Sequence, residues 1–200
     1  MKNKLLSIDQ VANVCGVSPD RVRRWIEKRG LKTDPTNNTE EFVHHADMID
    51  FFVKFNMPIP DSILPFKTKK ILFIYDTNSD NKVFMSFLIE FLGNLRTENN
   101  NFITDHISYG PDAKIKLMVF NPDLVLLDMT ENDNDAINMS IQIKSTEEFN
   151  KIKLVAITSD QLLELYKNRA VACGIDEILP YSMNLTLCTK SIISHNGLEY

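Results

Sequence analysis

The sequence lacks the features that would take it out of the class of ordinary globular proteins. Its three cysteines are isolated and odd in number, so we expect neither a disulfide framework nor a cysteine-based metal site. No apolar run approaches the roughly 20 residues that a membrane helix needs. The opening stretch MKNKLLSIDQ has two lysines but no apolar core, so no signal peptide is expected. These absences predict a cytoplasmic protein that does not bind a membrane.

Gly/Ser-rich linkers, repeats and low-complexity tracts are also missing, apart from a short polar patch at residues 97–101. With 44% hydrophobic and 24% charged residues, the composition is that of a chain able to build a core. The net charge of −5 is unevenly divided. Residues 1–66 carry nine Lys/Arg and nine Asp/Glu, whereas residues 67–200 carry thirteen and eighteen. The sequence therefore indicates a neutral module joined to an acidic one.

The two modules meet near the segment NMPIPDSILPFKTKK, whose three prolines forbid a continuous helix. Beyond it, apolar strand-like runs alternate with amphipathic segments. The strand-like runs are KILFIYD, NFITDHISYG, DLVLLD, KLVAITS and DEILPY. This alternation predicts an α/β fold with a parallel sheet that helices cover on both faces. We expect a first domain at residues 1–57, a linker at 58–68 and a second domain at 69–200.

Chemistry in a parallel sheet of this kind lies just beyond the carboxyl ends of the strands. The polar residues there are Asp76, Asp128, Thr158, Ser159 and Tyr181. Carboxylates that meet at one side of a sheet can hold a hard ion such as Mg²⁺, and a carboxylate beside that ion can accept a phosphoryl group. Any one of these residues could end its strand simply because the strand meets water. Their presence after several strands favours a site.

Three motifs follow one another in the second module: PDLVLLD, which ends at Asp128, VAITS, which contains Thr158, and ACGIDEIL. In this order they resemble the receiver domain of response regulators, over residues 69–194. The resemblance implies a flavodoxin-like domain with a five-stranded parallel sheet. It also implies that Asp128 is the phosphoacceptor, that Asp76 and Asp128 hold Mg²⁺, that Thr158 is the switch residue and that a histidine kinase is a partner.

Several positions depart from the pattern of that family. Tyr75 replaces one of the two usual acids after the first strand, and Tyr181 replaces the lysine that contacts the phosphoryl group. Ile178 stands at the usual aromatic switch position. In the loop after the phosphoacceptor, Asn132 and Ala136 replace the usual Pro and Gly. We therefore interpret the domain as an atypical receiver that mediates dimerisation or partner binding.

The first module contains SIDQVANVCGVSPDRVRRWIEKRGL, which predicts two short helices around a turn at Gly16. Ser7 and Ser18 are suitable N-caps, and Pro19 suits the first position of the second helix. Basic residues crowd this second helix and the residues after it: Arg21, Arg23, Arg24, Lys28, Arg29 and Lys32. A solvated helix face would also be basic, but two capped helices with a basic second helix favour a DNA-binding helix-turn-helix.

The next segment, LKTDPTNNTEEFV, predicts two short strands around a polar turn, and HHADMIDFFVKF predicts a following helix. This order of elements resembles the excisionase/MerR-type winged-helix family over residues 4–56, and the resemblance implies DNA as a partner. In that family the two strands and their turn form the wing, which usually carries Gly and Arg. The corresponding segment here, DPTNNTEE, is neutral to acidic.

The combined interpretation is a DNA-binding transcription regulator rather than an enzyme. We expect a homodimer through the second domain, around residues 161–172 and 185–193. One alternative is a conventional response regulator of a two-component system, in which a histidine kinase phosphorylates Asp128. The other is a protein-interaction adaptor that no longer binds DNA, an alternative that the neutral wing keeps open.

Overall fold

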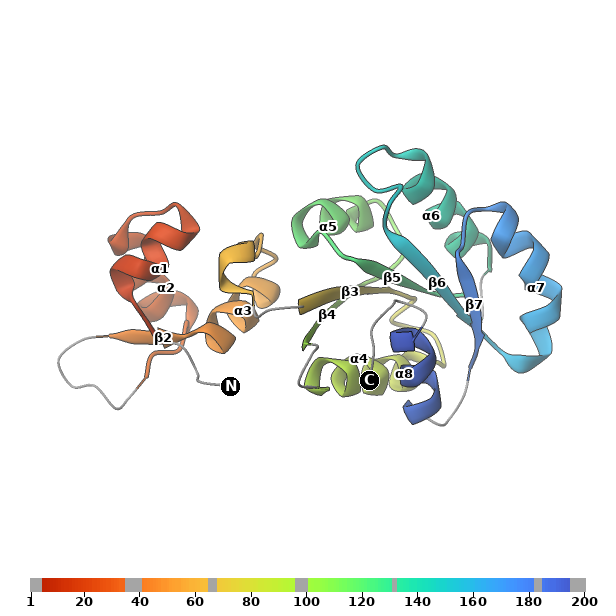
Figure 1. Cartoon of the computed structure of the whole chain (residues 1–200), viewed down its shortest axis with the longest axis horizontal. Helices are drawn as coiled ribbons and strands as arrows, with labels where there is room; N and C mark the ends of the chain where they lie inside the picture. Colours follow the sequence, from red (N-terminus) through yellow and green to blue (C-terminus); the bar gives the residue numbers. More distant parts are fainter. Residues whose placement is uncertain are drawn as a thin grey trace. The chain divides into compact units, whose positions relative to one another are not determined.

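The computed structural model describes residues 5–34, 41–64, 68–95, 101–130, 133–181 and 185–194. The chain forms two compact units, Met1–Pro65 and Phe66–Tyr200. Most of their elements are labelled in Figure 1. In the first unit they are β1 (Leu5–Ser7), α1 (Ile8–Cys15), α2 (Pro19–Arg29), β2 (Phe42–His44), α3 (His45–Lys54) and the short 3₁₀ helix η1 (Asp61–Ile63).

The first two helices begin and end where the sequence predicts. Ser7 forms a capping box with Gln10, since its hydroxyl accepts the Gln10 N–H and its own N–H donates to Gln10 Oε1 at 3.0 Å. The Ser18 hydroxyl accepts the Arg21 N–H at 3.3 Å and caps α2. Between the helices Gly16 has φ 63°, a left-handed conformation that glycine adopts without strain. Side-chain caps and a glycine turn therefore fix the start of α2.

An aromatic cluster joins α2 to α3. The Trp25 ring lies 5.5 Å from the Phe51 ring and 6.2 Å from the Phe52 ring, between centroids. Trp25, Phe51 and Phe52 are all buried. Other apolar side chains of the first unit are also buried: Leu6, Val11, Ala12, Val22, Leu31, Val43, Met48, Ile59 and Ile63. The inner side of α2 is therefore apolar, and its charged residues lie on the outside.

The predicted pair of strands around the polar turn is only partly present. Residues 31–34 form no strand, and β2 pairs antiparallel with β1 instead, with Leu6 opposite Val43. Both of these side chains are buried, so pairing with β1 brings two apolar residues into the core. The Asp34 N–H still donates to the Phe42 carbonyl at 2.8 Å. The turn at residues 35–40 lies outside the described residues.

The second unit contains a parallel sheet of five strands in the order β4-β3-β5-β6-β7, which confirms the α/β fold with a five-stranded parallel sheet predicted for this domain. The strands are β3 (Thr68–Ile74), β4 (Asn101–Ile107), β5 (Leu124–Asp128), β6 (Lys153–Thr158) and β7 (Glu177–Pro180). The helices are α4 (Lys82–Asn94), α5 (Asp112–Phe120), α6 (Asp133–Ser145), α7 (Asp160–Ala172) and α8 (Leu185–Ser194). Helices α4 and α8 cover one face of the sheet, and α5, α6 and α7 cover the other (Figure 1).

The central strands β3, β5 and β6 are buried on both faces, which explains their continuous apolar runs. Phe73 and Leu126 are fully buried in the core that α4 and α8 cover. Tyr75 belongs to the same core and is 3% exposed. None of the described helices is long and apolar enough to cross a membrane.

Candidate functional site

The sequence-predicted acids lie at the side of the sheet where the strands end. Asp128 is the last residue of β5, and Asp76 lies two residues beyond the end of β3, the neighbouring strand. Thr158 ends β6, which pairs with β5 on its other side and places Ile157 opposite Asp128. Three neighbouring strands of the sheet therefore place these residues at the same end of the sheet, where the strands have their carboxyl ends.

The carboxylate of Asp128 is buried and hydrogen-bonded within its own loop. Asp128 is 6% exposed, and its Oδ1 accepts the Thr130 N–H at 3.0 Å and the Thr130 hydroxyl at 2.6 Å. The Thr130 hydroxyl also contacts the side-chain amide of Asn81, the residue before α4. Residues two positions apart readily form such local bonds to an acid, so the spacing of Asp128 and Thr130 was a usable signal. The Thr130 side chain was not among the site residues predicted from the sequence.

Tyr109 also holds this loop, and sequence reasoning missed it. Its hydroxyl donates to the Asp128 backbone carbonyl at 2.8 Å. Burial raises the pKa of Tyr109 well above its ordinary value, and the nearby carboxylates of Asp128 and Asp135 raise it further. The hydroxyl therefore stays protonated at neutral pH and serves as a donor. Tyr109 lies far from Asp128 in the sequence, so no local pattern could pair them.

Asp76 organises the turn that leads into α4. It is exposed, and its Oδ1 accepts the Asn78 N–H at 2.8 Å. The two acids are the hard oxygen donors that Mg²⁺ prefers. However, no group of three His, Cys, Asp or Glu residues comes together within the described parts of the chain. Tyr75, which replaces the second acid, is packed in the apolar core. Asp76 and Asp128 therefore fit Mg²⁺, but they carry one negative charge fewer than the three acids of a typical receiver.

The remaining predicted positions serve packing and backbone contacts. The Thr158 hydroxyl is fully buried and donates to the Met129 carbonyl at 3.3 Å. The Tyr181 N–H donates to the Thr158 carbonyl, and its ring lies 4.5 Å from the Phe84 ring, between centroids. Ile178 is half-buried and Ala136 is fully buried. Asn132 lies outside the described residues.

The basic residues of the first unit divide into groups with different contacts. Arg23 forms an ion pair with Asp20 at 2.8 Å, and the Arg29 guanidinium lies 5.5 Å from the centre of the Phe55 ring. Lys32 is exposed beyond the end of α2. The remaining three are all exposed and form no ion pair with another described residue: Arg21, Arg24 and Lys28. We call these three residues the cationic face.

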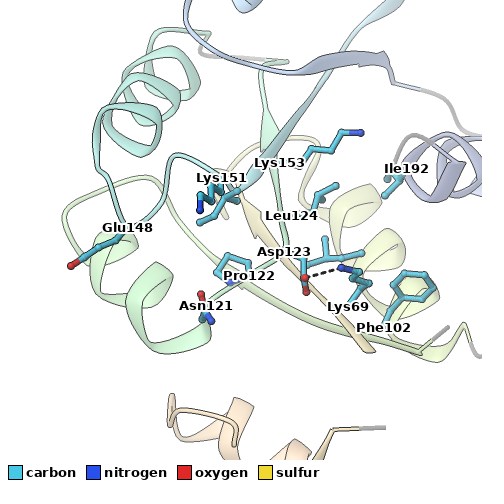
Figure 2. Close-up of a pocket in the computed structure, with 12 residues that line it drawn as sticks. Lys69, Phe102, Asn121, Pro122, Asp123, Leu124, Glu148, Lys151, Lys153 and Ile192 are labelled. Carbon is cyan, nitrogen blue, oxygen red and sulfur yellow. Dashed lines mark hydrogen bonds and ion pairs between the residues drawn. The ribbon is translucent and has the colours of Figure 1, made fainter. Parts of the chain in front are cut away.

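A cavity of about 410 Å³ lies at the amino ends of the strands, opposite the end that carries Asp128, among the first residues of β3, β5 and β6 (Figure 2). Asp123 fixes one wall, since its carboxylate binds the Lys69 ammonium at 2.9 Å and accepts the Lys70 N–H at 2.8 Å. Buried apolar side chains and three lysines line the cavity: Ile71, Phe102, Leu124, Ile152, Ile192, Lys69, Lys151 and Lys153. No pattern in the sequence predicted it.

The second unit resembles solved structures of receiver domains. One is the receiver domain of the sensor histidine kinase PA1611 from Pseudomonas aeruginosa PAO1, solved with magnesium in its active-site cleft. Its sequence identity is 16%, the match covers 65% of this chain and 98% of that one, and the TM-score is 0.51. Another is the N-terminal domain of the nisin resistance regulator NsrR, a lantibiotic response regulator, at 20% identity, 64% and 97% coverage and a TM-score of 0.50.

A third similar structure is the signal receiver domain of a DNA-binding response regulator (merR) from Colwellia psychrerythraea 34H. Its identity is 30%, with 64% of this chain and 97% of that one covered and a TM-score of 0.48. No protein-family model and no curated protein matches the sequence. The first two structures show that the second unit has the receiver fold.

Proposed function

We propose that this chain, whose second unit has the receiver fold, is a DNA-binding transcription regulator in which that unit mediates self-association or partner binding. The observation that carries the proposal is the cationic face on α2. Arg21, Arg24 and Lys28 stand three and four residues apart, so they lie on one side of the helix. The buried Val22 and Trp25 lie on the other side. A capped basic helix after a short turn is the arrangement that reads the major groove in helix-turn-helix proteins.

The position of each residue on α2 suggests its role. Arg21 lies in the first turn of α2, and the N-terminal residues of a recognition helix contact base edges. Arg24 is one turn further on, and arginine can bind guanine through two hydrogen bonds. Lys28 lies in the last turn, where an ammonium group suits a phosphate. Arg23 is engaged by Asp20 and so is a weaker candidate for a DNA contact.

The surroundings of Asp128 support a receiver that does not depend on phosphorylation. One carboxylate oxygen already accepts two hydrogen bonds from Thr130. A phosphoryl group on Asp128 would also lack the charge-assisted contact that a lysine makes, because Tyr181 stands there and packs against Phe84. If Mg²⁺ binds, Asp76 and Asp128 would hold it, and the ion would offset negative charge beside the acceptor.

A conventional phosphorylation-switched response regulator remains the second candidate. The observation that favours it is the placement of Asp76 and Asp128 after neighbouring strands of a receiver fold. The two candidates differ in one measurable respect. In a conventional response regulator, a small phosphodonor with Mg²⁺ changes DNA affinity severalfold, and Asp128→Asn abolishes that change. In the regulator proposed first, the DNA affinity is the same with and without the phosphodonor, and the same in the Asp128→Asn variant.

The proposal is tested by titrating the full chain with labelled duplex DNA at several salt concentrations. Binding through phosphate contacts gives a logarithmic salt slope of about 0.9 per phosphate neutralised. We expect a steep slope for the wild type and a shallower one for the variant Arg21→Ala/Arg24→Ala/Lys28→Ala. A matched control is Lys114→Ala/Lys167→Ala/Lys190→Ala, which removes three exposed lysines of the second unit. A wild type that does not bind DNA would favour the adaptor alternative, and equal binding by the wild type and the α2 variant would contradict the role of the cationic face.

A further inference from the structure

Helix α4 carries an apolar stripe on its outer surface. Val83, Phe87 and Phe91 recur every four residues and are 57%, 57% and 37% exposed. The inner side of the same helix is also apolar and is buried against the sheet, through Phe84, Met85, Leu88 and Leu92. A helix that is apolar on two sides is suited to packing on both. The outer stripe is therefore a candidate interaction surface.

Other exposed apolar residues of the second unit are less clustered. On α7, Leu165 and Val171 are 68% and 66% exposed, but they stand six residues apart and so lie on different sides of the helix. On α5, Ile115 and Met118 form an exposed pair without an aromatic ring. The described outward positions of α8 are polar: Thr186, Lys190 and Ser194. Among the described helices of this unit, α4 thus offers the best developed apolar surface.

The charges of α4 indicate which partner fits the stripe. Lys82 and Glu90 are the charged residues of this helix. Both are exposed, and both lie on the same flank of the stripe, with Phe87 between them in the sequence. When a second α4 runs antiparallel about a twofold axis at Phe87, Val83 meets the partner's Phe91. Lys82 then lies within about 3 Å, along the helix axis, of the level of the partner's Glu90.

A parallel arrangement would instead place Lys82 level with the partner's Lys82. The antiparallel arrangement is self-complementary in shape and charge, as a twofold interface requires. We propose that α4 of one copy pairs antiparallel with α4 of a second copy through Val83, Phe87 and Phe91. This inference rests on the self-association that the proposed function assigns to the second unit, and it names the surface.

The first test is sedimentation equilibrium of the full chain without DNA. We expect the wild type to be a dimer at roughly 50 μM, a concentration suited to a micromolar dissociation constant. Phe87→Glu places two carboxylates at the twofold axis, and the dissociation constant should rise at least roughly tenfold. Leu165→Glu puts the same charge at an exposed apolar position of α7 and should leave the constant unchanged. Circular dichroism confirms that each variant is folded.

The second test exchanges the flanking charges. Lys82→Glu alone and Glu90→Lys alone each place like charges level with one another and should weaken the dimer. The double variant restores opposite charges and should recover the wild-type dissociation constant.

Three outcomes would overturn the inference, and they differ in what else they affect. A wild-type monomer at this concentration contradicts both the inference and the proposed self-association. A dimer that Phe87→Glu leaves intact contradicts the inference alone and moves the interface elsewhere, for instance to residues 161–172 and 185–193. Single charge variants that weaken the dimer without recovery in the double variant contradict the antiparallel arrangement.

Discussion

The Thr130 hydroxyl donates a hydrogen bond of 2.6 Å to Asp128 Oδ1, so the acid at the predicted phosphoacceptor position is engaged by its own loop. A second bond to the same oxygen comes from the Thr130 backbone N–H. Both bonds stabilise the ionised carboxylate and draw electron density from the oxygen that they bind. Any reaction at that oxygen must first break or rearrange them.

Thr130→Ala should therefore make Asp128 more reactive. The variant loses the hydroxyl bond and keeps the backbone bond, and we expect severalfold faster formation of a phosphoryl adduct. The measurement is intact mass over time with acetyl phosphate and Mg²⁺, with Asp128→Asn as the unreactive control. Equal rates in the wild type and the Thr130→Ala variant would show that the hydroxyl bond does not restrain the carboxylate.

Arg24→Ala should weaken DNA binding more than Arg23→Ala does. The Arg24 side chain is exposed on the cationic face, whereas Arg23 is held by Asp20 at 2.8 Å. Loss of a base-reading arginine costs about 1–3 kcal/mol and relaxes specificity at one base pair. Gel-shift titrations of both variants on the same fragment measure the difference. A larger loss for Arg23→Ala would contradict the assignment of the cationic face.

Tyr109→Phe should change the dependence of stability on pH. The folded pKa of Tyr109 lies above its ordinary value of 10.0, so its stabilising contribution is complete below pH 10 and is lost as the pH rises through the folded value. At pH 8 we expect the variant to be about 1 kcal/mol less stable, for the lost hydrogen bond. That gap should shrink above pH 10. Urea denaturation of both proteins at several pH values measures it, and a gap that stays constant would show that ionisation of Tyr109 does not affect stability.

Phe52→Ala should destabilise the first unit. Phe52 is 2% exposed, and truncation of a buried phenylalanine costs about 3–5 kcal/mol of unfolding free energy. Trp25 is the only tryptophan of the chain, so its fluorescence follows the unfolding of this unit. Leu165→Ala, at an exposed position of the second unit, serves as the control and should leave the fluorescence transition unchanged.

The strands and helices that the sequence predicted best are those with strong local signals. The apolar runs of β3, β5 and β6 and the caps at Ser7 and Ser18 depend on residues that are close in sequence, and the structure has them where predicted. The pairing of β2 was predicted wrongly because its partner, Leu5–Ser7, is short and lies before α1. Such pairing depends on packing between distant segments, which no local pattern contains.

The same distinction applies to the candidate site. Asp76, Asp128 and Thr158 could be placed at one side of the sheet because strand ends in a parallel sheet lie together. Tyr109 and Asn81 could not be found, since their contacts with the Asp128 loop join segments that are 19 and 49 residues apart. The basic residues of the first unit could be identified from the sequence, but those that have a partner among the described residues could not be told from those that have none. Only the structure separates Arg23 and Arg29, which have partners, from the three of the cationic face.

The contact of Asn81 with Thr130 couples α4 energetically to the loop that follows Asp128. Asn81 immediately precedes α4, and Thr130 binds the Asp128 carboxylate. If pairing of α4 strengthens or weakens this contact, it changes the affinity of the loop for any ion or ligand, and binding at the loop changes the dimer dissociation constant by the same factor. Measuring Mg²⁺ affinity for the Phe87→Glu monomer and the wild-type dimer would give that coupling free energy directly.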